Sequence, residues 1–321
     1  MVKSSELNIP DLDVVGHRSL RINSIGSIKI TFARIAGSKF APKLVKFINK
    51  KLYKFGLGAA INRYDTSLTF FSSKNDKKLY SNYTNHDTFY NFGSGAFHHP
   101  RWQNFDYPGN SDFYKAIQGK VGGDFTAIDL CQDNLKLDIA DNSTSLIYCA
   151  HTLEHLTEEK THIFLKECLR ILKPGGIMRI AVPTTQESFN FAKILFDQDA
   201  VPLKTKQKVI LLAASSVLWN SNTLPDNEII EIAIESKFSA EKFHKLCAKR
   251  GVSIDFNPEG PERHVSFWGQ DKLKIASRKA GFSAYMPFYR GQSLAEPFKN
   301  IEVFDTTEPH LSHYGEFVKE S

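Results

Sequence analysis

Residues 88–106 read TFYNFGSGAFHHPRWQNFD, and this segment decides the fold. A short apolar run, Thr88–Phe92, leads directly into Gly93–Gly95, and a second apolar run ends at Asp106. Glycines that follow a strand let a ligand approach the backbone where a Cβ would collide with it. Ligands of open α/β sheets bind beyond the carboxyl ends of the strands. The segment therefore predicts two neighbouring strands with a ligand site at their carboxyl ends.

The spacing of the glycines and the first acidic residue argues against a dinucleotide site. Ten residues separate Gly95 from Asp106, and His98 occupies the position of a third glycine. The dinucleotide fingerprint places its acidic residue about 20 residues on, after a full helix. A carboxylate at the end of the second strand can instead accept hydrogen bonds from both hydroxyls of a ribose, and Asp129, which ends the third strand, can accept from an adenine amino group. A nicotinamide oxidoreductase is therefore disfavoured.

From about residue 86 onward, short apolar runs alternate with amphipathic stretches, a pattern that predicts βαβ units and a mainly parallel sheet. The expected strands are Thr88–Phe92, Arg101–Tyr107, Phe125–Leu130, Ser145–Cys149, Gly176–Pro183, Phe282–Tyr289 and His313–Val318. The expected helices between them are Glu158–Leu172 and Gln270–Ala280. Residues 198–262 interrupt the alternation with helical patterns at Leu203–Trp219 and Ala240–Arg250, so we interpret them as a helical insertion that acts as a lid.

Composition excludes several classes of protein. The 321 residues are 41% hydrophobic and 24% charged, which is typical of globular domains and not of disordered chains. The longest apolar run, Val209–Trp219, is shorter than the about 20 residues that a membrane-spanning helix needs. Residues Met1–Asp13 lack the apolar core of a signal peptide. The four cysteines are scattered without a CxxC pair, so we expect free thiols in a reducing cytoplasm.

Charge divides the chain into two parts. Residues 1–85 carry a formal charge of +10 and the remainder carries −4, which predicts a basic N-terminal element of 1–85 and a separate domain of 86–321. The element is expected to hold a short hairpin within 14–35 and an amphipathic helix, Pro42–Phe55. The apolar face of that helix comprises Leu44, Ile48, Leu52 and Phe55. The helix either packs on the domain or lies on an anionic membrane surface or a phosphate-bearing acceptor. Nucleic acid is disfavoured, because the helix has no arginine.

The sequence resembles the class I S-adenosylmethionine-dependent methyltransferases, most closely the type 11 methyltransferase domains often found in surface-polysaccharide biosynthesis. The resemblance rests on Phe92–Gly95, His99–Asp106, Asp141–Leu156, Arg170–Gly176, Val182–Pro183, Ala280–Phe282 and Leu311–Ser312. It covers roughly 86–195 and 263–319. It implies an α/β fold: a Rossmann-like, seven-stranded, mainly parallel sheet with helices on both faces and a reversed last strand. The helix after the glycine loop must be short or absent.

The resemblance also implies how S-adenosylmethionine binds. The methionine moiety is expected near the glycine loop, the ribose on Asp106, the adenine near Asp129, and the sulfonium beside the end of the fourth strand. The cofactor-binding residues that it implies are Phe92, Gly93, Ser94, Gly95, Asp106, Tyr107, Asp129, Leu130, Cys149 and Ala150.

Catalytic candidates follow the fourth strand. His151, Glu154 and His155 are spaced i, i+3, i+4, so they share one face if that turn is helical. A hydroxyl acceptor needs a base near neutral pH, and the ordinary pKa of histidine, about 6.5, suits that role. Two alternatives stay open: Glu154 and His155 cap and support the next helix, or the group ligates a divalent ion. We take the three as catalytic candidates and assign no metal ligand.

Three later residues are candidates for acceptor binding. His264 opens the segment after the insertion and can complete either the catalytic or the metal-binding arrangement, and Arg290 and Ser293 follow the sixth strand. The alternative for all three is an exposed loop.

The expected function is O-methylation of a sugar, glycan or other small-molecule acceptor, an acceptor class that rests on the resemblance alone. The alternatives are an RNA or protein methyltransferase that docks through residues 1–85, and a catalytically inactive binding module. The oligomeric state is left open.

Overall fold

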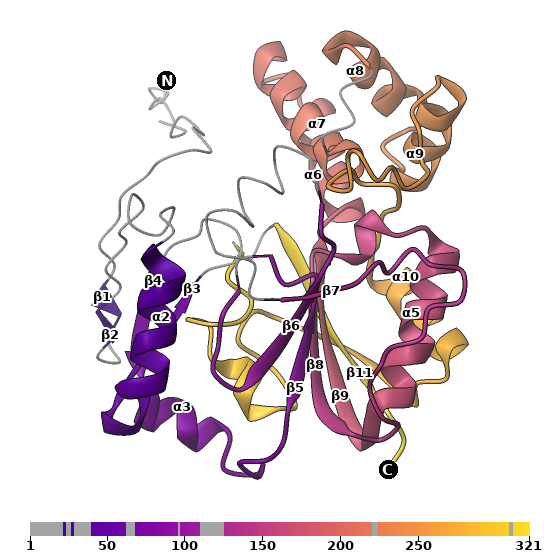
Figure 1. Cartoon of the computed structure of the whole chain (residues 1–321). Helices are drawn as coiled ribbons and strands as arrows, with labels where there is room; N and C mark the ends of the chain where they lie inside the picture. The colour runs from indigo at the N-terminus through magenta and orange to yellow at the C-terminus, as the bar shows by residue number, and fades with distance from the viewer. Residues whose placement is uncertain are drawn as a thin grey trace.

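The computed structural model describes residues 22–23, 27–28, 40–61, 68–95, 97–109, 125–219, 224–307 and 311–321. Its central strands are β5 (Phe89–Phe92), β6 (Trp102–Asp106), β7 (Thr126–Ala127), β8 (Thr144–Ala150), β9 (Leu172–Pro183), β10 (Ala284–Phe288) and β11 (Ser312–Val318). They form one seven-stranded sheet with the order β10-β11-β9-β8-β5-β6-β7 (Figure 1). Strand β11 is antiparallel to both of its neighbours, and the other neighbouring pairs are parallel. The predicted Rossmann-like sheet with a reversed last strand is confirmed.

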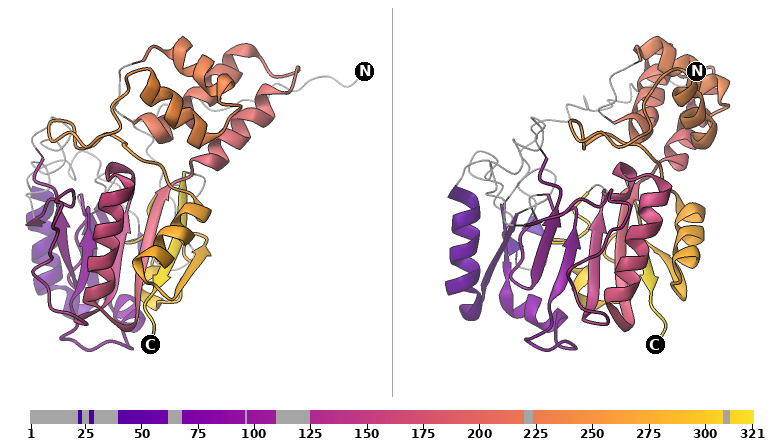
Figure 2. Two further views of the ribbon diagram at one scale, coloured as in Figure 1. Left: turned by 90° about the vertical axis from the view of Figure 1, so that its right-hand side faces the viewer. Right: turned by 45° about the vertical axis from the view of Figure 1, so that its right-hand side comes forward.

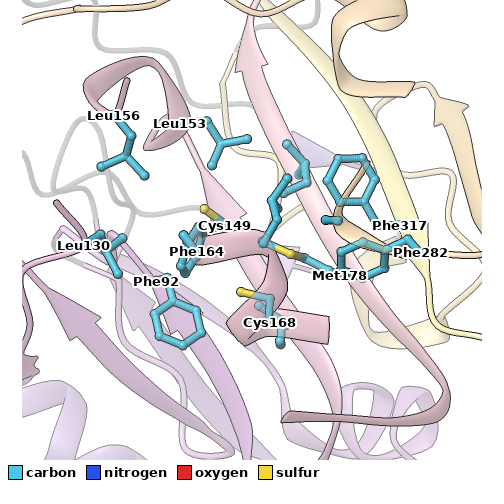
Figure 3. Close-up of a cluster of buried hydrophobic side chains, with 14 of the residues drawn as sticks. Phe92, Leu130, Cys149, Leu153, Leu156, Phe164, Cys168, Met178, Phe282 and Phe317 are labelled. Atoms are coloured by element: carbon cyan, nitrogen blue, oxygen red, sulfur yellow. The ribbon is translucent and has the colours of Figure 1, made fainter. Parts of the chain in front are cut away.

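Helices α5 (Glu158–Ile171) and α10 (Gln270–Ala280) cover one face of the sheet (Figure 2). The side chain of Thr157 caps the start of α5 by accepting a hydrogen bond from a backbone amide of the first turn. The buried side of α5 meets the strands, and the ring of Phe164 lies edge-on to Phe92 at 5.2 Å between centroids (Figure 3). All four cysteines are free thiols, as predicted.

The connection between β5 and β6 crosses the opposite face of the sheet, and its described residues form no helix. Residues 93–101 connect these strands, and the described part of that stretch holds only turns, bends and an isolated bridge. Parallel strands ordinarily need a connection of about a dozen residues or more, most often a helix. The face is covered instead by the hairpin of β3 (Leu57–Ile61) and β4 (Leu68–Ser72), by α3 (Ser73–Leu79) and by the turn η3 (Glu296–Lys299). The N-terminal part of the chain thus takes the place of a crossover helix.

Helix α2 (Phe40–Lys51) packs on the β3–β4 hairpin (Figure 1). Val45 and Ile48 of the helix are buried there against Ala59 and Leu68 of the hairpin. The lysines of α2 remain on the exposed side. The apolar face of α2 is therefore packed, but on the hairpin of the N-terminal element itself, and contact with an anionic membrane surface stays a prediction.

The predicted N-terminal helix differs from the structure at its carboxyl end. The expected helix Pro42–Phe55 is shorter, because α2 is followed by the separate 3-10 turn η1 (Tyr53–Phe55). Phe55 is 73% exposed, so its expected place on the buried face is wrong. The hairpin expected within 14–35 is confirmed in its described residues, where β1 (Ile22–Asn23) pairs antiparallel with β2 (Ser27–Ile28).

Asp76, on α3, joins the N-terminal part to the core through a buried hydrogen-bond network. Its carboxylate accepts from the Tyr53 hydroxyl at 2.5 Å and from the Asn300 side-chain amide at 3.2 Å. The Nε2 atom of His99 lies 3.1 Å from the same carboxylate. Burial alone would raise the pKa of Asp76, but the contacts with His99, Tyr53 and Asn300 lower it below its usual value.

We expect Asp76→Ala to lower the free energy of unfolding by about 2–4 kcal/mol, because it leaves three donors without their acceptor. Since the pKa of Asp76 is lowered in the fold, this contribution is present at neutral pH and is lost as the pH falls below about 4. Urea denaturation at pH 7 measures the change, with Lys78→Ala on the exposed side of α3 as the control. Equal unfolding free energies for the two variants would contradict the prediction.

A helical unit rises beyond the carboxyl ends of the parallel strands (Figures 1 and 2). Its helices are α6 (Gln186–Phe196), α7 (Leu203–Leu218), α8 (Asp226–Glu235) and α9 (Ala240–Lys249). They share a hydrophobic core of their own, in which Phe189 of α6 meets Phe243 of α9 at 5.0 Å between ring centroids. The unit therefore includes α6, which precedes the predicted insertion of 198–262. Within the described ranges, no helix combines the length and apolarity that crossing a bilayer requires.

Candidate active site

The glycine loop after β5 adopts a backbone that glycine favours. Gly93 and Gly95 have φ angles of 64° and 53°, in the left-handed region. A Cβ on Gly93 would lie 2.1 Å from the hydroxyl oxygen of Thr152, which follows β8, so the two loops approach closely only because this position is glycine. Between the glycines, Ser94 is fully buried, and its hydroxyl has no hydrogen-bond partner among the described residues.

Asp106 connects the end of β6 to the glycine loop. Its side chain is 5% exposed, and Oδ2 accepts a hydrogen bond of 2.6 Å from the backbone amide of Gly95. The other carboxylate oxygen accepts from the amide of Tyr107 at 2.8 Å. A carboxylate has about four acceptor positions, so these two bonds are compatible with further donors. The structure thus brings together the glycine loop and the acidic residue that the sequence analysis paired.

The other residues implied for cofactor binding divide into two groups. Asp129 lies two residues beyond β7 and accepts a 2.8 Å hydrogen bond from the backbone amide of Cys131. Tyr107 is half-buried, with its ring edge-on to Phe256 at 5.5 Å between centroids. The side chains of Phe92, Leu130 and Cys149 belong to the core beneath the site (Figure 3). These three, and the buried Ala150, can contact a cofactor through their backbone.

His151 occupies the first position after β8 in an unusual backbone conformation. Its φ angle is 46°, which is uncommon for a residue other than glycine. The conformation is held by a 2.7 Å hydrogen bond from its amide to the carbonyl of Ala181, on β9. The imidazole Nε2 lies 2.7 Å from the hydroxyl of Ser312, the first residue of β11, and Nδ1 lies 3.3 Å from Oε1 of Glu154. Both ring nitrogens therefore have fixed neighbours.

Glu154 is a buried carboxylate in the 3-10 turn η2 (Leu153–His155). Its side chain is 1% exposed, and neither oxygen has a hydrogen bond of good geometry among the described residues. Burial alone would raise the pKa of Glu154, but the neighbouring imidazoles, His151 first, then His155 and His264, lower it to about 2. The group is therefore an anion at neutral pH, surrounded by histidines.

His264 joins this group from the segment that returns from the helical unit to α10. Its Nε2 atom is 4.0 Å from Oε1 of Glu154, and its ring centroid is 5.0 Å from that of His155. Burial lowers the pKa of His264 to about 4, so the ring is neutral at pH 7. The sequence analysis proposed that His264 could complete the arrangement, and the structure places it there.

Arg290 and Ser293 take part in a different network. The Nε atom of Arg290 donates to the backbone carbonyl of Asp305 at 2.8 Å, and the Ser293 hydroxyl donates to Glu316 at 2.5 Å. Among the described residues these contacts lie outside the group around His151, so acceptor binding by Arg290 and Ser293 stays a prediction. The alternative of an exposed loop does not hold for Ser293, because its hydroxyl bonds to the buried Glu316.

Sequence reasoning missed two residues of the site, Thr152 and Ser312. Thr152 directly follows His151. Its contact with Gly93 arises because β5 and β8 are neighbours in the sheet although they are far apart in the sequence. Ser312 could have been found from the reversed last strand, because a reversed strand begins at the edge where the parallel strands end.

Comparison with known proteins indicates the type of domain over part of the chain. A protein family described as a methyltransferase domain matches residues 110–180. Among solved structures, the chain is similar to a Haloferax volcanii methyltransferase in complex with the Trm112 activator, at 14% identity and a TM-score of 0.38, covering 78% of this chain and 88% of that one. No curated protein matches the chain in sequence.

Two further structures are similar at the same level. An S-adenosylmethionine-dependent methyltransferase from Thermotoga maritima has 12% identity and a TM-score of 0.34, with 89% of this chain and 99% of that chain covered. Human N-acetylserotonin methyltransferase, solved with its cofactor, has 12% identity and a TM-score of 0.35, with 78% of this chain but 52% of that chain covered.

The residues at the carboxyl edge fit S-adenosylmethionine. The glycine loop offers a buried hydroxyl without a partner at Ser94, and the carboxylate of Asp106 ends the next strand beside it. The sheet has the strand number and the reversed last strand of the class I methyltransferases that the sequence resembles. With the methyltransferase domain matched at 110–180, these observations support an enzyme that transfers methyl groups from S-adenosylmethionine.

Proposed function

We propose that this enzyme O-methylates a sugar, glycan or other small-molecule acceptor, and we favour precursors of surface polysaccharides. The sulfonium of the cofactor is itself a strong methyl donor, so the protein mainly has to hold the acceptor in line and exclude water. A hydroxyl acceptor must also lose its proton. The proposal therefore needs a base beside the methyl group, at the end of β8.

The fixed position of His151 carries the proposal. Its imidazole lies between the buried carboxylate of Glu154 and the hydroxyl of Ser312, so both its orientation and its tautomer are constrained. A carboxylate beside Nδ1 stabilises the positive charge that forms when Nε2 takes a proton. We propose that an acceptor hydroxyl replaces Ser312 as the neighbour of Nε2 and that Glu154 positions the ring. Thr152, next along the chain, lies against the glycine loop, which supports a position of His151 beside the proposed cofactor site.

The remaining residues have proposed roles that follow from their places. Asp106 takes the ribose, Asp129 the adenine, and the loop with Ser94 the methionine moiety. His155 and His264 are proposed to face the acceptor together with His151. The residues proposed to contact the cofactor through their backbone or to shape its site are Phe92, Gly93, Gly95, Tyr107, Leu130, Cys149 and Ala150. Arg290 and Ser293 are proposed to contact the distal part of the acceptor.

The test separates catalysis from cofactor binding. We expect His151→Ala to lower kcat by about 10²-fold, at the lower end of what general-base catalysis contributes, because the sulfonium supplies most of the reactivity. The affinity for S-adenosylmethionine should remain unchanged. Transfer from labelled cofactor to a panel of oligosaccharides and nucleotide sugars measures the rate, and calorimetry measures the affinity.

His244→Ala is the matched control, because His244 is also half-buried but its Nε2 hydrogen-bonds to the backbone carbonyl of Val265 rather than to Glu154 or Ser312. Full turnover in a folded His151→Ala variant would exclude His151 as the base. Transfer to RNA alone, with a steep loss of activity as salt is added, would replace the glycan proposal with the nucleic-acid alternative.

A further inference from the structure

Apart from His151 at 3.3 Å, the carboxylate of Glu154 has few of the partners that a buried anion needs. Both of its oxygens are inaccessible to solvent and have no hydrogen bond of good geometry within the described part of the chain. A buried charge without compensation costs several kcal/mol, so such groups are normally paired or coordinate a metal. The nearest side-chain groups are imidazoles rather than a lysine or an arginine.

Two of these imidazoles are oriented by the main chain. Nδ1 of His155 lies 3.0 Å from the carbonyl oxygen of Arg263, and Nδ1 of His264 lies 2.8 Å from that of Ser216. A carbonyl can only accept, so in the neutral form of each ring Nδ1 carries the proton and Nε2 keeps the lone pair. An imidazole whose other N–H is held by a backbone carbonyl is the usual arrangement around a bound metal ion.

We propose that Glu154, His155 and His264 bind one divalent transition-metal ion, with Zn²⁺ as the first choice. One ligand atom from each of the three side chains lies within 4.8 Å of the other two, so small side-chain movements can bring all of them onto one ion. Two imidazole nitrogens and one carboxylate oxygen form a donor set that suits zinc, and they leave further coordination positions open. Mg²⁺ and Ca²⁺ prefer sites made of oxygen alone.

The proposed ion would connect two parts of the fold. Glu154 and His155 belong to the turn after β8, whereas His264 belongs to the return segment of the helical unit. This junction already exists in the backbone, because the amides of Val265 and Ser266 both donate to the carbonyl of Glu154, at 2.8 and 3.1 Å. The ion would hold the return segment beside His151. The open coordination positions of the ion would be available to an oxygen of the acceptor.

A competing explanation keeps the cluster free of metal. In that case the imidazole of His151, at the observed 3.3 Å, is the main neighbour that compensates the charge of Glu154. The two explanations differ at His264, whose nearest approach to the carboxylate is 4.0 Å and which the competing explanation does not need.

The test measures metal binding to the full-length protein in the absence of acceptor. The protein is stripped with a chelator, dialysed and titrated with Zn²⁺, and bound metal is counted by mass spectrometry. Co²⁺ substitution, followed by its visible absorption, reports on the ligands. We expect one ion per chain, and we expect Glu154→Gln, His155→Ala and His264→Ala each to weaken binding by at least about 100-fold, more than loss of a supporting residue costs.

His244→Ala, in the neighbouring helix α9, is the control and should keep the affinity of the parent protein. Circular dichroism checks that each variant is folded, and His264→Gln replaces His264→Ala if the latter fails to fold. Binding of less than one tenth of an ion per chain, or equal affinity in the parent and the His264 variants, would overturn the metal site. Because no methyl transfer is measured, this outcome is independent of the proposed acceptor.

Discussion

Replacing Asp106 with alanine is expected to weaken the binding of S-adenosylmethionine by about 10²–10⁴-fold. Two hydrogen bonds from ribose hydroxyls to a carboxylate are worth about 1.5–3 kcal/mol each, and about 1.4 kcal/mol corresponds to a factor of ten. The variant also removes the acceptor of the Gly95 amide, a 2.6 Å hydrogen bond that orients the glycine loop. Isothermal titration calorimetry with S-adenosylmethionine and its demethylated product measures both affinities.

Asp106→Asn separates the charge from the shape of the side chain. One oxygen remains for the Gly95 or the Tyr107 amide, so the loop is retained in part, but the negative charge is lost. We expect this variant to lie between the parent protein and Asp106→Ala in affinity, with little change in melting temperature. Unchanged affinity in a folded Asp106→Ala protein would refute the ribose assignment.

The pairing of Asp106 with the glycine loop was predictable from sequence, because it depends on one rule. Parallel neighbouring strands end at the same edge, so residues that follow β5 and β6 must meet. The alternation of apolar runs predicted the strand assignments in the same way. These are local patterns, and they needed no knowledge of distant partners.

The contacts of the catalytic candidates were only partly predictable. The spacing of His151, Glu154 and His155 indicated one face of a helix, but Glu154 and His155 lie in a 3-10 turn and His151 precedes it. The neighbours that fix them, Ser312 and His264, are more than 100 residues away in the chain. Periodicity carries no information about such distant pairs, which depend on how the helical unit and the reversed strand return to the sheet.

The N-terminal element shows the same limit. Its helix was expected from its apolar spacing, but its place on the sheet was not. The connection between β5 and β6 is too short for a helix, and this leaves a surface that the β3–β4 hairpin fills. Neither the hairpin nor the contact of Asp76 with Asn300, 224 residues away, has a local sequence signal.

An arginine in the middle of an apolar strand was the clearest signal that sequence analysis did not use. Arg179 lies within the run Gly176–Pro183 and is fully buried. Its guanidinium contacts Asp305 Oδ2 at 2.5 Å and Glu316 Oε1 at 3.2 Å, and both carboxylates are also fully buried. Burial raises the pKa of Asp305 and of Glu316, and the guanidinium opposes this effect.

We expect Arg179→Met to lower the free energy of unfolding at pH 7 by about 3–5 kcal/mol, because breaking a buried ion pair leaves uncompensated charge in the core. Raised pKa values mean that the folded protein binds more protons than the unfolded chain, so the two carboxyl groups contribute stability at low pH that is lost as the pH rises. In Arg179→Met the guanidinium no longer opposes the effect of burial, so the pKa values of both carboxyl groups should rise further. The loss should therefore be smaller at pH 5 than at pH 8, as measured by urea denaturation at both values.

Two further variants make the result specific to the buried charges. Adding Glu316→Gln to Arg179→Met removes one unpaired carboxylate and should recover part of the lost stability. Lys193→Met, which breaks the exposed ion pair of Lys193 with Asp197, should cost less than about 1 kcal/mol at either pH. A loss for Arg179→Met that is independent of pH and unaffected by Glu316→Gln would show that the arginine acts through packing alone. The stability of the sheet between β9 and β11 would then not depend on pairing these charges.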